Sequence, residues 1–135
     1  MVDTGTGNRK GAFEEDCPSR VVLTHVASRW GVLILTSLHG GPMRFHELRD
    51  GIGGISEKML AQNLRLLARD GLVERSVEAS TPPRVSYALT PLGRELSSQL
   101  RTLVDWIACR TDRIVAAQRR YDRTEEGTFS KKVSD

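Results

Sequence analysis

One stretch of the chain decides the fold: residues 56–90 read SEKMLAQNLRLLARDGLVERSVEASTPPRVSYALT. Leucines recur through its first part at helical spacing: Leu60, Leu64 and Leu67. Ser56 stands just before them as a helix cap, and Gly71 suits a left-handed helix stop. After that glycine, apolar and polar residues alternate with a period of two, as in a strand. This order of helix, turn and two-stranded ribbon predicts a winged helix-turn-helix.

The side of the expected helix that lies opposite the leucines is polar and basic. The residues there that we take as candidate DNA contacts are Ser56, Lys58, Met59, Gln62, Asn63, Arg65 and Arg69. Lysine and arginine bind phosphates or guanine O6 and N7, and glutamine can pair bidentately with adenine. A solvated helix face can look the same. Because a two-stranded ribbon follows directly, we favour the interpretation that this face binds DNA.

The ribbon is expected to be a hairpin with one buried face. Its alternating apolar residues are Val73, Val77, Val85, Tyr87 and Leu89. Pro82 and Pro83 stiffen the loop between the strands and end the ladder there. Arg84 beside them is placed to reach a phosphate or the minor groove, which would make residues 79–85 a wing. The alternative is an ordinary turn with an exposed arginine.

Upstream residues supply the rest of this module. The dense apolar stretch from Trp30 to Leu38 predicts a buried helix, for which Ser28 is a candidate cap. Residues 43–45 can form a short edge strand, and Phe45, Leu48 and Ile52 then repeat at helical spacing. The glycine-rich residues 51–55 allow a sharp turn between this helix and the one that begins after Ser56.

A long helix is expected from Thr90 to about Gln118, with Thr90 as its cap and Pro91 in its first turn. Its apolar stripe is longer than the core of a small domain can cover, and consists of Leu92, Leu96, Leu100, Leu103, Ile107 and Ile114. A second copy of the chain would explain the excess, and the residues expected at that interface are Val22, Leu100, Leu103, Trp106 and Ile107. The alternative is a helix that folds back on its own domain. The expected organisation is a flexible arm at 1–16, a domain at 17–118 and a polar tail at 119–135.

Several linked motifs between Cys17 and Trp106 resemble the HxlR-type bacterial transcriptional regulators. They are Cys17-Pro18, Arg29-Trp30, Leu33-Ile34-Leu35, Phe45-His46-Glu47-Leu48, Gly54-Ile55-Ser56, Met59-Leu60, Asp70-Gly71-Leu72-Val73, Pro83-Arg84-Val85 and Leu89-Thr90-Pro91-Leu92-Gly93. The resemblance implies a mainly α fold with a small β-hairpin, a winged helix-turn-helix that dimerises through its N- and C-terminal helices. It also implies binding to inverted-repeat operators, usually as a repressor, with residues 56–69 as the recognition helix. Ala27-Ser28 departs from the family, which usually has two glycines before the Arg-Trp pair.

Cys17 is a candidate redox or electrophile sensor. It precedes a short expected helix, where helix-end N–H groups and the nearby Arg20 would stabilise a thiolate. The negative charges of Glu14, Glu15 and Asp16 oppose this effect. The family resemblance implies the same role, because some members sense quinones, aldehydes or oxidants with a cysteine here, although others do not. The alternative is a small packing residue, which is also what we expect of Cys109.

The remaining composition argues against an enzyme. The histidines and cysteines do not fall at metal-ligand spacing, and no glycine-rich phosphate loop opens a helix after a strand. We therefore expect no cofactor and no metal. The 135 residues contain no apolar run long enough for a bilayer, so we expect a cytoplasmic protein without a membrane partner. The net charge of +3 is compatible with a polyanion but adds little by itself.

Two classes of function remain. One is a homodimeric regulator that binds double-stranded DNA at a palindromic site, its half-sites roughly 34 Å apart. Such a regulator could be released by an electrophile, an oxidant or a small ligand held near Trp30 and Trp106. The other class is a winged-helix module that binds only another protein. A steep salt dependence of DNA affinity separates the two.

Overall fold

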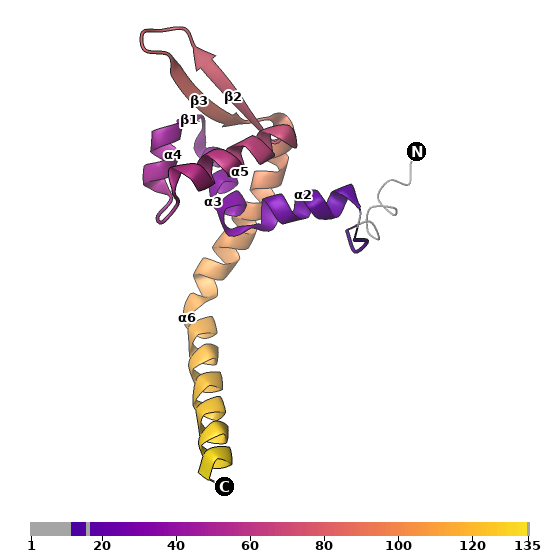
Figure 1. Cartoon of the computed structure of the whole chain (residues 1–135), viewed down its shortest axis with the longest axis vertical. Coiled ribbons are helices and arrows are strands. Elements are labelled where there is room, and N and C mark those ends of the chain that lie inside the picture. The colour runs from indigo at the N-terminus through magenta and orange to yellow at the C-terminus, as the bar shows by residue number, and fades with distance from the viewer. Residues whose placement is uncertain (1–11, 16, 135) are drawn as a thin grey trace. The chain divides into compact units, whose positions relative to one another are not determined.

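The computed structural model describes residues 12–15 and 17–134, with side chains up to residue 126. Its elements in chain order are α2 (Pro18–Ala27), α3 (Arg29–Ser37), η1 (Leu38–Gly40), β1 (Met43–Arg44), α4 (Phe45–Gly51), α5 (Glu57–Arg69), β2 (Val73–Glu78), β3 (Arg84–Leu89) and α6 (Pro91–Ser134) (Figure 1). The chain divides into two compact units, one ending at Leu100 and the other beginning at Arg101. The mainly helical fold with a small antiparallel sheet confirms the predicted fold class.

Helix α3 lies at the centre of the first unit. Ile34 and Leu35 are fully buried, and the Ser28 side chain caps the helix by accepting the N–H of Gly31 at 3.0 Å, as predicted. A Cβ at Gly31 would clash with the carbonyl oxygen of His25, so only glycine lets α2 and α3 meet this closely. Within the described residues, no single helix is long and apolar enough to cross a bilayer. Residues 18–27 and 29–40 meet that test only as a pair bent by 72°.

Helices α4 and α5 form the predicted helix-turn-helix. Ile52 and Ile55 are both buried and anchor the turn between them in the core. The Ser56 hydroxyl accepts the N–H of Met59 at 3.1 Å and caps α5. The three leucines predicted to face the core, Leu60, Leu64 and Leu67, are each at most 2% exposed. Gly71 ends the helix with φ +77°, the left-handed conformation that favours glycine.

The sheet has the strand order β1-β3-β2, and both pairings are antiparallel. The predicted edge strand is β1, where Met43 pairs with Tyr87. The prediction that the hairpin has one buried face is wrong for most of its length. Val73 is the only buried residue of β2, and Val77 is 55% exposed. The reason is that the outer part of the hairpin extends beyond the helices (Figure 1). Contact with the core comes from Val73 and Leu89 at the base and from Tyr87 in the middle of β3.

Helix α6 begins as predicted. Thr90 caps it by accepting the N–H of Gly93 at 3.0 Å, and Pro91 is its first residue. The helix continues to Ser134, so its predicted end near Gln118 and the separate polar tail at 119–135 are wrong. Glutamine, arginine and glutamate, which are good helix formers, make up most of residues 118–126, and no proline or glycine there ends the helix. Of the predicted arm at 1–16, residues 1–11 and 16 lie outside the described residues.

Candidate nucleic-acid interface

The outer face of α5 presents an exposed row of polar and basic side chains. Lys58, Gln62, Arg65 and Arg69 are all exposed and follow one another at helical spacing. The opposite face holds the buried leucines, so the helix cannot rotate without exposing the core. Among the described side chains, the three cations of this row form no salt bridge. Their charges are therefore available to a ligand.

The other predicted contacts on α5 differ in their surroundings. The Ser56 side chain is engaged as the helix cap, although the residue is exposed. Met59 is 37% exposed, whereas Asn63 is half-buried and donates its amide to the carbonyl oxygen of Met59 at 2.8 Å. Asn63 thus has part of its hydrogen-bonding capacity in use within the helix. The structure brings six of the seven predicted residues onto α5 and places Ser56 at its N-cap, while their contact with DNA stays a prediction.

Two arginines outside the predicted site residues, Arg75 and Arg44, adjoin this surface. Arg75 on β2 and Arg65 on α5 line the same groove of about 270 Å³, together with Tyr87 of β3. Near the tip of the hairpin, where Arg84 pairs with Glu78, Arg84 and Arg44 line a second depression of about 230 Å³. Glu47 and Glu78 also line that depression, so carboxylates partly balance its positive charge. Pairing between β1 and β3 brings Arg44 to this site from far away in the sequence.

An ion pair connects the two helices of the helix-turn-helix. The Arg49 guanidinium on α4 lies 3.1 Å from the Asp50 carboxylate and 3.5 Å from that of Glu57, in the first turn of α5. These side chains are substantially exposed, so the pair adds little stability. The carboxylate of Glu57 also lies at the helix end where a negative charge is favourable.

Cys17 is the N-cap residue of α2 and is half-buried. The backbone N–H of Ser19 lowers the pKa of the Cys17 thiol, and the Ser19 hydroxyl contributes in the same direction. Partial burial opposes this pKa shift, as does the negative charge of Glu14. Arg20 lowers the pKa through its backbone N–H, rather than through the side-chain charge that we expected to act. Cys109 is exposed on α6, so it does not pack within its own chain, and packing against a second copy stays a prediction.

The predicted dimer residues fall into two groups. Val22 in the first unit is 38% exposed, and in the second unit Leu103, Trp106 and Ile107 are between 45% and 51% exposed. Leu100 is only 8% exposed because it belongs to the core of the first unit. It therefore has little surface left for a second copy, which corrects its assignment to the interface. Trp106 is stacked with Arg110, whose guanidinium lies 4.5 Å from the ring centroid.

Within the described residues, no group of three or more histidine, cysteine, aspartate or glutamate side chains could hold a metal ion.

Comparison with known proteins identifies the family. Residues 25–115 match the model of the HxlR-like helix-turn-helix. The chain is 51% identical over 106 residues to the uncharacterized HTH-type transcriptional regulator YtfH of Escherichia coli. The aligned region covers 78% of this chain and 84% of that relative.

Two solved structures show the same fold. The putative transcriptional regulator ytfH from Salmonella typhimurium superposes with a TM-score of 0.75 at 50% identity, covering 78% of this chain and 95% of that one. The redox regulator HypR in its oxidized form superposes with a TM-score of 0.64 at 32% identity, covering 69% and 96% of the two chains. The structural neighbours thus include winged-helix regulators. The chain belongs to the HxlR-like helix-turn-helix family of transcriptional regulators.

Proposed function

We propose that this regulator binds double-stranded DNA, with α5 in the major groove and the β2–β3 hairpin against the flanking sugar-phosphate backbone of the DNA. The observation that carries the proposal is the exposed row of Lys58, Gln62, Arg65 and Arg69, whose cations are unpaired among the described residues. Gln62 is the residue suited to read adenine, and the cations are suited to phosphates or guanine. Arg84 at the hairpin would contact the backbone and add affinity at any sequence.

The working form is proposed to be a homodimer. In the second unit, exposed apolar side chains recur along α6 at spacings of four and seven: Leu103, Ile107, Ile114 and Tyr121. This is the spacing at which two helices pack along a common seam. A two-fold dimer presents two copies of α5 about one turn of DNA apart, roughly 34 Å, which predicts a palindromic site. Bound across a promoter, such a dimer would act in the cytoplasm as a repressor.

The test is titration of the full chain with duplex DNA at several salt concentrations. Phosphate contacts release counterions, so the logarithm of the association constant should fall linearly with the logarithm of the salt concentration. The slope should be about −0.9 for each phosphate that the protein contacts. A winged-helix module that binds only another protein would show no such slope. Promoter footprinting with the purified protein then locates the site, and a reporter fused to that promoter separates repression from activation.

A chemical input through Cys17 is proposed as the means of release from DNA. It is supported by the lowered pKa of this thiol, which raises the reactive thiolate fraction, and by the relative described as a redox regulator. The rival interpretation is a packing residue, and a small ligand remains the other candidate effector.

Treatment with a quinone or with diamide should release DNA from the wild-type protein and from Cys109→Ser. It should not release DNA from Cys17→Ser. Release from Cys17→Ser would remove the thiol from the proposal.

A further inference from the structure

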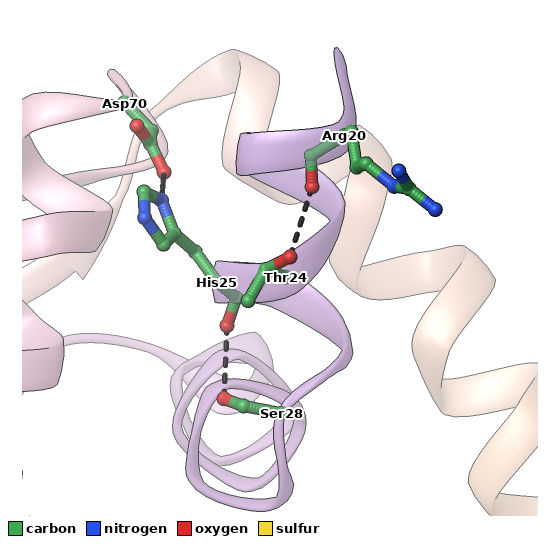
Figure 2. Close-up of polar contacts among 5 residues, drawn as sticks. All are labelled: Arg20, Thr24, His25, Ser28 and Asp70. Atoms are coloured by element: carbon green, nitrogen blue, oxygen red, sulfur yellow. Dashed lines mark hydrogen bonds and ion pairs between the residues drawn. The ribbon is translucent and has the colours of Figure 1, made fainter. Parts of the chain in front are cut away.

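A hydrogen bond between two side chains joins α2 to the end of α5. Nδ1 of His25 lies 2.6 Å from Oδ2 of Asp70, and the two residues are 45 positions apart in the sequence. Their side chains are only 13% and 8% exposed. Figure 2 shows the His25 ring pointing from α2 to Asp70, across the space between the two helices. An ionised carboxylate only accepts hydrogen bonds, so Nδ1 of His25 carries the hydrogen.

The position of Asp70 is unfavourable for α5 taken alone. Asp70 is the C-cap residue, where the helix dipole presents its negative end. A nearly buried carboxylate there is costly unless a donor satisfies it. Among the described residues, the only hydrogen bond to this carboxylate comes from His25. The pair therefore does not stabilise α5 as an isolated helix. Its effect is to hold α2 and α5 together.

His25 also fixes the corner between α2 and α3. Its carbonyl oxygen accepts the Ser28 hydroxyl at 3.0 Å (Figure 2). The Ser28 oxygen in turn accepts the N–H of Gly31 at 3.0 Å. One residue thus links the end of α2, the start of α3 and the end of α5. Arg69, the last cation of the exposed row, directly precedes Asp70.

We infer that His25 and Asp70 are positioning residues for DNA binding: their contact holds the end of α5 against α2 and so sets where the exposed row lies. This inference rests on the proposed DNA binding. Helix α2 carries the exposed Val22, one of the residues predicted from the sequence to lie at the dimer interface, so the pair connects that part of the predicted interface to α5. The contact then controls the separation of the two copies of α5, and with it the tolerance for half-site spacing.

The experiment uses the full-length protein and a duplex that the wild type selects from a random library. Dissociation constants are measured for that duplex and for one with a base pair inserted at its centre, which shifts the half-sites by about a tenth of a turn. All variants are compared at a temperature where each is fully folded by circular dichroism. His25→Phe removes the donor and should weaken binding to the selected duplex by about tenfold, with reduced discrimination between the two spacings.

Conservative variants separate positioning from general stability. The amide nitrogen of Asn can occupy the place of Nδ1, so His25→Asn should restore affinity and spacing preference to within about threefold of the wild type. Asp70→Asn keeps an acceptor and should also remain close to the wild type. The double variant His25→Phe with Asp70→Leu should not recover DNA binding, even if it recovers stability, because the contact is still absent.

A matched control is the second histidine that joins two elements. Nδ1 of His39 in η1 lies 2.8 Å from the hydroxyl of the buried Ser97 in α6, and neither residue belongs to α5. His39→Phe should lower the melting temperature and leave the affinity and spacing preference of the folded protein unchanged.

If the wild type shows no salt-dependent DNA binding, the proposed function fails. If the wild type binds and folded His25→Phe keeps both its affinity and its spacing preference, only the positioning role is overturned. Equal losses in folded His25→Phe and His25→Asn also overturn it, as does an equal loss in folded His39→Phe. Should His25→Phe not fold, the comparison of His25→Asn and His25→Gln decides. Gln places its amide at the position of Nε2 and should not rescue binding, and its full rescue would count against the inference.

Discussion

Thr90 joins the first turn of α6 to the turn that follows α5. Its hydroxyl donates to the carbonyl oxygen of Gly71 at 2.6 Å. The Thr90 hydroxyl oxygen in turn accepts the N–H of Gly93 at 3.0 Å. The backbone N–H of Thr90 donates to the carbonyl oxygen of Leu72 at 3.1 Å. One residue therefore caps a helix and closes the base of the hairpin against the end of α5.

Thr90→Val keeps the shape of the side chain and removes both hydroxyl hydrogen bonds. The free energy of unfolding should fall by about 1–3 kcal/mol, because a helix cap and a second hydrogen bond are lost together. Urea denaturation measures this change. Thr111→Val is the control, since the Thr111 hydroxyl only bonds back to the Ile107 carbonyl within α6 and should contribute little.

Gln62→Ala and Arg84→Ala should weaken DNA binding in different ways. Loss of the Gln62 amide should reduce the difference in binding free energy between matched and mismatched sites by about 1–3 kcal/mol. Loss of Arg84 should weaken binding to both sites alike and make the salt slope shallower by about one unit. Fluorescence anisotropy with matched and mismatched duplexes gives both quantities. Arg94→Ala, an exposed arginine on α6, is the control. Identical effects of the two substitutions would contradict these roles.

Ser19 should control the reactivity of Cys17. The Ser19 backbone and hydroxyl lower the pKa of the thiol, so Ser19→Ala removes the second contribution and moves the pKa upward. At neutral pH a higher pKa means less thiolate, and alkylation by iodoacetamide should be slower. The pH profile of the alkylation rate in Cys109→Ser measures the shift, with Cys17→Ser as the blank. An unchanged profile would show that the Ser19 hydroxyl has no such effect.

Neighbouring apolar positions on α6 should respond differently to substitution. Leu103→Glu places a charge in the exposed seam and should shift the protein toward monomer, seen by sedimentation velocity. Leu100→Ala removes a buried side chain and should lower the free energy of unfolding by about 2–5 kcal/mol. A Leu103→Glu protein with unchanged sedimentation would argue against α6 as the dimer contact.

The two strand valines should also differ. Val77→Lys lies on the exposed part of β2 and should change the free energy of unfolding by no more than about 0.5 kcal/mol. Val73→Ala opens a space at the buried base of the strand and should cost about 2 kcal/mol. Thermal denaturation compares the two. A large loss in Val77→Lys would mean that the hairpin packs against something along its length.

Local signals in the sequence were enough for the elements that carry the proposed site. Helical spacing of Leu60, Leu64 and Leu67 located the buried face of α5, and Ser28, Ser56 and Thr90 were found as caps. These features depend on neighbours within a few residues, so periodicity and capping chemistry reveal them. The end of α6 is also a local feature, yet the mixed charges and Gly127 after residue 118 favour a polar tail, whereas the helix continues to Ser134.

Tertiary structure alone decided which residues meet across the chain. Alternation in β2 predicted a buried face, but Val77 is exposed because no helix covers that part of the hairpin. The apolar stripe of α6 could not distinguish Leu100, which is buried in the first unit, from the exposed Leu103. The contact of His25 with Asp70 has no local signature, since 45 residues separate its partners. Spacing along a chain reports which side of an element is apolar, whereas burial and long-range pairing depend on what the folded chain brings against that side.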